Sequence, residues 1–143
     1  MVLQNLTDIL RQGRRYRHIL LEPHGMNGWQ CGYLTEIAAH PGMSQDQLAQ
    51  ILCLNKSNVA RRVAALEDDG FVTRRPSERD KRVMELRLTD KAAAMLPYLY
   101  EIQEQWDSYL TQDMTQEEKE LLTQLLARMQ KRASGWRKED DHV

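Results

Sequence analysis

The segment from residue 41 to residue 89 constrains the fold most, because its pattern predicts two short helices followed by a hairpin. Ser44 and Gln47 form a capping-box pair, in which each side chain satisfies the free amide of the other residue. A helix of about eight residues is expected behind this pair. Its inner face is predicted to carry Leu48, Ile51 and Leu52.

A second helix is predicted over residues 56–69. Asn55 is its N-cap, and Val59, Val63 and Leu66 give it one apolar stripe at positions i, i+4 and i+7. Gly70 is expected to end the helix in the left-handed conformation. Two short helices joined by a tight Leu-Asn turn predict a helix-turn-helix.

The polar face of the second helix follows from a rotation of about 100° per residue. Opposite Val59 this face carries Ser57, Arg61, Ala64 and Ala65, and Asn58 and Arg62 flank them. Short, small and basic side chains leave room for a nucleic-acid groove and offer donors to base edges and phosphates. An ordinary solvated helix face is the alternative interpretation of the same residues.

A hairpin is predicted after this helix, with strands at residues 71–74 and 83–88. The second strand alternates, with Val83, Glu85 and Arg87 on one side and Met84, Leu86 and Leu88 on the other. Its tip, residues 75–82, is polar and basic. A helix-turn-helix followed by such a hairpin is a winged helix, whose wing can reach an adjacent minor groove.

Several motifs in this segment make it resemble the MarR (multiple antibiotic resistance regulator) family of bacterial winged-helix transcription factors. The motifs are Gln47-Leu48-Ala49, Leu66-Glu-x-x-Gly-Phe-Val-x-Arg74, Asp80-Lys81-Arg82 and Leu88-Thr89. The resemblance covers residues 29–97 and is looser outside them. It departs at Ala92, where the family often has glycine, in the start of a helix.

The resemblance implies a fold that is mostly α, with a two-stranded wing, and a function in binding double-stranded DNA. Arg82 would enter the minor groove, with Asp80 orienting its guanidinium through a charge-assisted pair. A solvated salt bridge worth about 0 to 1 kcal/mol is the alternative for these two residues. The candidate DNA-binding residues are Ser44, Gln47, Lys56, Ser57, Asn58, Arg61, Arg62, Arg74, Arg79, Asp80, Lys81 and Arg82.

The charge distribution supports a nucleic-acid partner better than the net charge of −1 does. Residues 53–82 hold eight Lys and Arg residues against five Asp and Glu residues, a net charge of +3, so the rest of the chain carries −4. A basic patch on a mildly acidic body predicts salt-sensitive binding to phosphates.

The 143 residues predict a single domain, with the winged helix at residues 29–97 and helices on both sides of it. One amphipathic helix is expected over residues 3–21 and another over residues 29–39. Thr89 is expected to cap a long helix that reaches about residue 111 and tolerates Pro97, and Thr115 and Glu118 form a capping box for a last helix. The charged tail, residues 135–143, is predicted to be disordered.

The flanking helices predict a homodimer. Residues 3–22 and 98–134 present more leucines than one chain can cover, and the last helix aligns Leu121, Leu125 and Met129. Burial against a second copy would give a two-fold dimer, which the resemblance also implies. Two symmetric recognition helices predict a pseudo-palindromic site with half-sites roughly 10 bp apart.

The resemblance implies an effector as well, a small aromatic acid or phenol that would release a repressor from DNA. The candidate ligand-binding residues are Tyr16, His18, Trp29, Cys31 and Tyr33. Aromatic side chains at helical spacing are also typical of plain core packing, which is the alternative here.

Other classes of function find less support in the sequence. Four histidines and two unlinked cysteines give no catalytic constellation, so we expect no enzyme activity, no metal and no cofactor. With no signal-peptide pattern and no membrane-length apolar run, the sequence predicts a cytoplasmic protein.

Two alternatives to a ligand-controlled DNA regulator stay open. A thiol-based redox variant would use Cys31, because Cys53 lies in an apolar context that predicts a buried, inert thiol. A winged helix that binds proteins instead of DNA would be expected to lack Arg61, Asp80 and Arg82, and all three are present.

Overall fold

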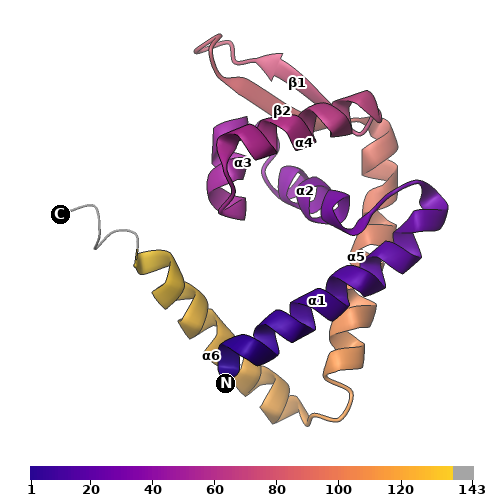
Figure 1. The fold of residues 1–143 in the computed structure, drawn as a ribbon, viewed down its shortest axis with the longest axis vertical. Coiled ribbons are helices and arrows are strands. Elements are labelled where there is room, and N and C mark those ends of the chain that lie inside the picture. Colours follow the sequence, from indigo (N-terminus) through magenta and orange to yellow (C-terminus); the bar gives the residue numbers. More distant parts are fainter. Residues whose placement is uncertain (137–143) are drawn as a thin grey trace. The chain divides into compact units, whose positions relative to one another are not determined.

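The computed structural model describes residues 1–136. The elements in chain order are α1 (Val2–Leu21), η1 (Glu22–His24), α2 (Gly28–Ala39), α3 (Gln45–Leu52), α4 (Lys56–Asp68), β1 (Val72–Pro76), β2 (Met84–Leu88), α5 (Asp90–Leu110) and α6 (Gln116–Gly135) (Figure 1). This is the mostly helical winged helix-turn-helix that the sequence predicts.

The chain divides into two compact units, one from Met1 to Trp106 and one that begins at Asp107. The first holds the helix-turn-helix, the wing and most of α5, and the second holds α6. Because α6 continues through Gly135, the predicted tail starts later than residue 135, and residues 137–143 lie outside the described part.

The helix starts agree with the predicted caps. Ser44 Oγ accepts a hydrogen bond from Gln47 N at 3.0 Å, and Gln47 Oε1 accepts one from Ser44 N at 2.9 Å. Asn55 Oδ1 accepts from Ser57 N at 2.8 Å, which fixes the first turn of α4. Side-chain acceptors at these positions satisfy amides that the helix itself leaves unpaired.

The core of the first unit lies between α2, α4, the wing and α5. Its fully buried members include Leu34, Leu48, Val59, Val63, Leu66, Leu86, Leu99 and Ile102. The predicted stripe of α4 is therefore buried along its whole length. It packs with α3 and β1, while α2 contacts α1 and β2.

The predicted inner face of α3 is wrong at Ile51, whose exposed fraction is 44%. Leu48 is buried as predicted, Ala49 is buried in place of Ile51, and Leu52 is half-buried. At about 100° per residue these three lie on one side of the helix, and Ile51 lies roughly 110° from their centre. Ala49 was missed because a small apolar residue gives a weak periodic signal.

The wing is an antiparallel pair with a register from Val72 opposite Leu88 to Pro76 opposite Met84. A short segment before α3 adds to its other edge, which the sequence did not predict. Gly42 N donates to Leu86 O at 3.1 Å, and Leu86 N donates to Met43 O at 2.8 Å. The wing and the start of the helix-turn-helix are thereby joined by backbone hydrogen bonds.

The start of α5 is fixed to the end of α4. Thr89 Oγ1 donates to Gly70 O at 2.6 Å and accepts from Ala92 N at 3.3 Å, which confirms its capping role. Lys91 Nζ donates to Asp69 O at 2.8 Å. Later in α5, Trp106 stacks on Tyr16 of α1, with ring centroids 4.9 Å apart.

The last helix begins at its predicted capping box, where Thr115 Oγ1 accepts from Glu118 N at 3.2 Å. Its apolar residues remain accessible in a single chain, with exposed fractions of 54% at Leu121 and 43% at Leu125. None of the helices within residues 1–136 combines the length and hydrophobicity needed to cross a bilayer.

Candidate nucleic-acid interface

The outer face of α4 is the first part of the candidate site. Ser57, Arg61 and Ala65 are exposed on the side away from the buried stripe. Lys56, in the first turn, is also exposed and lies 3.4 Å from the carboxylate of Asp46 on α3. An exposed helix face with a hydroxyl, a guanidinium and a small residue is narrow enough to enter a major groove.

Arg62 belongs to a different side of the same helix. Its guanidinium lies 4.9 Å from the ring centroid of Trp29 and 5.9 Å from that of Tyr33, both on α2. The neighbouring candidate Asn58 is half-buried. The structure therefore directs Arg62 toward α2 and leaves Arg61 as the guanidinium on the outer face.

The wing tip holds the second part of the site. Arg82 donates from Nε to Asp80 Oδ1 at 3.1 Å and from Nη2 to Asp80 Oδ2 at 3.2 Å, so the predicted charge-assisted pair is present. The Arg82 side chain is 91% exposed. Hydrogen bonds from the Arg82 side chain and backbone hold the pKa of Asp80 below its usual value.

Ser77 shapes the tip, and sequence reasoning missed it. It is buried, its Oγ accepts from Arg79 N at 3.2 Å, and its own N donates to Val83 O at 2.8 Å. A serine directly after a proline is a common turn signal that could have identified it. The loop it closes leaves Arg79 and Lys81 exposed.

Arg74 does not join this surface. It donates from Nη2 to Glu67 Oε1 at 3.1 Å, and its backbone N donates to Glu67 Oε2 at 3.2 Å. The side-chain hydrogen bond is the main reason that the pKa of Glu67 is lowered. Arg74 ties β1 to α4, so its assignment as a DNA-binding residue is not supported by its position.

Comparison with known proteins identifies the family. A sequence profile described as the MarR family matches residues 24–83. The HTH-type transcriptional regulator BilQ of Clostridium symbiosum (strain WAL-14163) is 32% identical over 111 residues, which are 78% of this chain and 77% of BilQ. A crystal structure of MarR matches with a TM-score of 0.89 and 27% identity, over 97% of this chain and 95% of that one. The chain belongs to the MarR family.

One solved relative contains DNA. A crystal structure of a mutant MarR from E. coli complexed with operator DNA matches with a TM-score of 0.79 and 22% identity, over 88% of this chain and 91% of that one. At this identity the likeness establishes a shared fold. Membership of the MarR family makes the chain a transcriptional regulator that binds DNA.

The five candidate ligand residues of this MarR-family chain do not form one site, although Trp29 and Tyr33 contact each other edge to face. Tyr16 stacks on Trp106, and Cys31 Sγ lies 3.9 Å from Gln103 Nε2, so both face α5. Trp29 and Tyr33 lie under Arg62 of α4. His18 is exposed on α1.

The predicted burial of Cys53 is wrong, and Cys31, the candidate redox thiol, is the buried one of the two cysteines. Cys31 is fully buried, and this burial raises the pKa of its thiol, with Arg17 acting weakly in the opposite direction. Cys53 is exposed. Its backbone turns left-handed at the end of α3, with φ of 52°, so its side chain leaves the apolar face that the flanking leucines suggested.

Metal chemistry finds no support in the described part of the chain. Among residues 1–136, no three His, Cys, Asp or Glu side chains come close enough to share an ion.

Proposed function

We propose that this MarR-family chain is a sequence-specific DNA-binding repressor that acts as a homodimer on a pseudo-palindromic operator. The observation that carries the proposal is that two exposed guanidinium groups lie on two different elements, one on a helix and one on the wing. Arg61 stands on the outer face of α4, and Arg82 extends from the wing tip while Asp80 holds it. An arginine on a helix face suits the major groove, and an arginine on a wing tip suits the neighbouring minor groove.

The contacts would divide between reading bases and positioning the duplex. In this proposal Ser57, Asn58 and Arg61 face base edges and phosphates of the major groove, where arginine pairs best with guanine. Arg82 enters the minor groove, whose narrow form attracts a guanidinium. The exposed Arg79 and Lys81 on the tip, with Lys56, Ser44 and Gln47 at two helix starts, lie where phosphates would pass.

A homodimer is proposed because α6 leaves an apolar face uncovered. Its exposed residues are Leu121, Leu125, Leu126 and Met129, together with Val2, Leu3 and Leu10 at the start of α1. Monomers seldom expose so many large apolar side chains on amphipathic helices. Two-fold pairing through residues 3–22 and 98–134 would place two recognition helices about one DNA turn apart.

For regulation we propose that the dimer represses transcription by occupying a promoter site. It would act in the cytoplasm, where the DNA lies, and a small aromatic acid would release it from the DNA. The support for the ligand is the aromatic content near the junction of α1, α2 and α5, where Tyr16 stacks on Trp106. A ligand that prefers one spacing of the recognition helices would shift the population toward it. Addition of small aromatic acids should then weaken DNA binding and raise the melting temperature of the protein.

The first experiment measures fluorescence anisotropy of a labelled duplex from the region upstream of the coding sequence, at low and moderate salt. The wild-type chain is compared with Arg82→Ala and with Arg11→Ala, which removes an exposed arginine of α1 outside α4 and the wing. Because α1 belongs to the proposed dimer interface, the oligomeric state of both variants is measured as well. We expect Arg82→Ala to weaken binding by about 1 to 3 kcal/mol and Arg11→Ala to leave it near the wild-type value.

Three outcomes decide the proposal. Salt-sensitive, specific binding that depends on Arg82 supports it. Equal loss in both variants would point to general charge attraction without a role for the wing. If the wild type prefers no sequence even after selection from random duplexes, the protein-interaction alternative replaces DNA binding.

A further inference from the structure

Arg62 lies next to Arg61 in the sequence, but its side chain contacts α2, whereas that of Arg61 is exposed. Its guanidinium is 4.9 Å from the centroid of Trp29 and 5.9 Å from that of Tyr33. We infer that Arg62 is a positioning residue, which holds the rotation of α4 against α2 through a cation–π contact and so aims Ser57 and Arg61. This inference rests on the proposed DNA-binding function.

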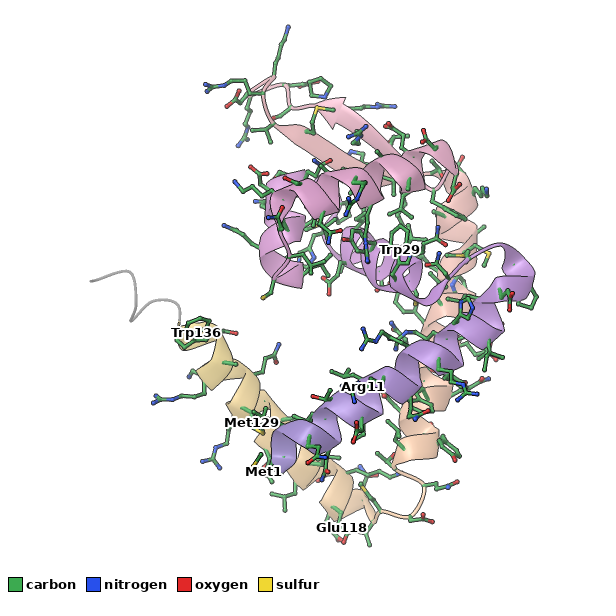
Figure 2. The ribbon with its side chains drawn as sticks, in the orientation of Figure 1. Met1, Arg11, Trp29, Glu118, Met129 and Trp136 are labelled. Atoms are coloured by element: carbon green, nitrogen blue, oxygen red, sulfur yellow. The ribbon has the colours of Figure 1, made fainter. Side chains whose placement is uncertain are left out.

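The aromatic pair on α2 is a fixed partner for the guanidinium. Trp29 and Tyr33 are one turn apart, and their rings meet edge to face with centroids separated by 5.3 Å. Tyr33 is only 3% exposed, so the pair is built into the core side of α2. Figure 2 shows Trp29 on the side of α2 that faces α4. A guanidinium on such a surface is attracted by the negative faces of the rings.

Other directional contacts of α4 lie nearer its two ends, where Lys56 pairs with Asp46 and Glu67 pairs with Arg74, and Arg62 lies between them. Val59, Val63 and Leu66 are fully buried, but apolar burial is not directional. The far end is held by main-chain acceptors, where Lys91 Nζ reaches Asp69 O at 2.8 Å. Arg62 lies at the edge of the apolar stripe, about 60° around the helix from Val59, where a contact opposes rotation most directly.

A small rotation would matter on the outer face. Side chains reach roughly 5 to 6 Å from a helix axis, so a turn of about 20° moves their ends by about 2 Å. Base-edge hydrogen bonds have donor–acceptor distances of about 2.7 to 3.2 Å and do not tolerate such a shift. Loss of the contact with α2 would therefore reduce DNA affinity although Arg62 touches no DNA.

The experiment compares Arg62→Gln, Trp29→Leu and the double variant by operator binding at several salt concentrations. Arg61→Gln is the matched control, because it removes the neighbouring guanidinium from the outer face. Trp29→Leu is decisive, since it leaves the charge of Arg62 in place and removes the nearer of its two aromatic partners, while Tyr33 stays. Trp29→Phe keeps a ring at the site, and circular dichroism checks that each variant is folded.

We expect Arg62→Gln and Trp29→Leu each to weaken operator binding by about fivefold, the size of one cation–π contact. The double variant should be no weaker than the poorer single variant, because both remove the same contact. Trp29→Phe should recover most of the affinity. The slope of log affinity against log salt should stay at the wild-type value for Arg62→Gln and become shallower for Arg61→Gln.

The inference is overturned if Trp29→Leu binds as tightly as the wild type while Arg62→Gln weakens binding and makes the salt slope shallower. That result would make Arg62 a direct phosphate contact. It is also overturned if both single variants bind the operator normally. If the wild type shows no specific binding to any duplex, the proposed DNA-binding function is wrong, whatever the role of Arg62. The wild-type measurement therefore distinguishes a failure of the proposed function from a failure of this inference.

Discussion

Asp80 and Arg82 form a two-point pair inside the wing, with Nε to Oδ1 at 3.1 Å and Nη2 to Oδ2 at 3.2 Å. The backbone N of Arg82 donates to Asp80 Oδ1 as well, at 3.0 Å. Three hydrogen bonds from one residue to one carboxylate fix the direction of the guanidinium before any partner arrives. Such preorganisation reduces the side-chain entropy that binding would otherwise cost.

The first prediction concerns Asp80→Asn. Removal of a negative charge near DNA should strengthen binding if Asp80 were only a solvated carboxylate. We expect the opposite, a loss of about three- to tenfold in operator affinity, because the charge-assisted fork that aims Arg82 is lost. Anisotropy measures the affinity, and Glu78→Gln, another exposed acid of the tip, is the control that should bind as well as the wild type or better.

The second prediction is the titration of Asp80 itself. Its pKa is lowered by Arg82, so the carboxylate is charged and paired at all pH values above the usual range near 3.9. The pair should be lost only as the pH falls through the lowered value. An NMR titration should place the Asp80 midpoint below that range and show it rising in Arg82→Gln. Equal midpoints in the two proteins would contradict the pair in solution.

The third prediction concerns Glu67 and Arg74, which join α4 to β1 at 3.1 Å. The pKa of Glu67 is lower in the folded state than in the unfolded state. The pair therefore stabilises the fold at pH values above the unfolded-state pKa, and this stabilisation is lost as the pH falls through the folded-state pKa. Both side chains are partly exposed, so the pair should contribute only about 0.5 kcal/mol.

Urea unfolding of Glu67→Gln, Arg74→Met and the double variant checks this pair near neutral pH and again in acid below the lowered pKa of Glu67. The coupling energy should shrink toward zero in acid, and operator affinity should change far less than in Arg82→Ala. A large loss of operator affinity in Arg74→Met with unchanged stability would restore Arg74 to the DNA-binding surface.

The fourth prediction concerns Gly70, which ends α4 with φ of 78°. Space is available for a methyl group, since the nearest atoms to an added Cβ are those of Lys91 at 4.0 Å. Gly70→Ala should nevertheless destabilise the protein by about 1 to 2 kcal/mol, because an L-residue is strained in the left-handed region. Gly32→Ala, within α2 and with nothing near its Cβ, should instead stabilise by roughly 0.5 to 1 kcal/mol.

Urea unfolding at one fixed protein concentration compares these two glycine variants, since a dimer would make the apparent stability depend on concentration. Equal effects at Gly70 and Gly32 would show that the left-handed geometry is not maintained in solution.

Local rules in the sequence were sufficient for most of the fold. The caps at Ser44, Asn55 and Thr115 depend on neighbours within three residues, and the stripe of α4 depends on a single helix. Each was therefore predictable without knowledge of distant contacts. The edge contributed by Gly42 and Met43 was not, because it depends on which segment reaches β2 in three dimensions.

In the candidate site, too, contacts between residues close in the sequence were predictable, whereas contacts between different elements were not. Asp80 and Arg82 are two residues apart and were paired correctly from the motif. Arg62 and Arg74 were grouped with Arg61 from helical position and from the family motif, whereas their partners lie on α2 and at the end of α4. The sequence alone does not show which arginines already contact another side chain of the protein, because those contacts depend on the three-dimensional fold.

The fifth prediction uses the different environments of the two cysteines. Cys53 is exposed at the turn between α3 and α4, whereas Cys31 is buried and has a raised thiol pKa. Since the thiolate is the reactive form, a disulfide reagent should modify Cys53 quickly and Cys31 only slowly in the native protein. Cys53→Ser should remove the fast phase, Cys31→Ser should leave it, and urea should make both thiols of the wild type react at similar rates. A fast phase that survives in Cys53→Ser would mean that Cys31 becomes accessible through opening between α2 and α5.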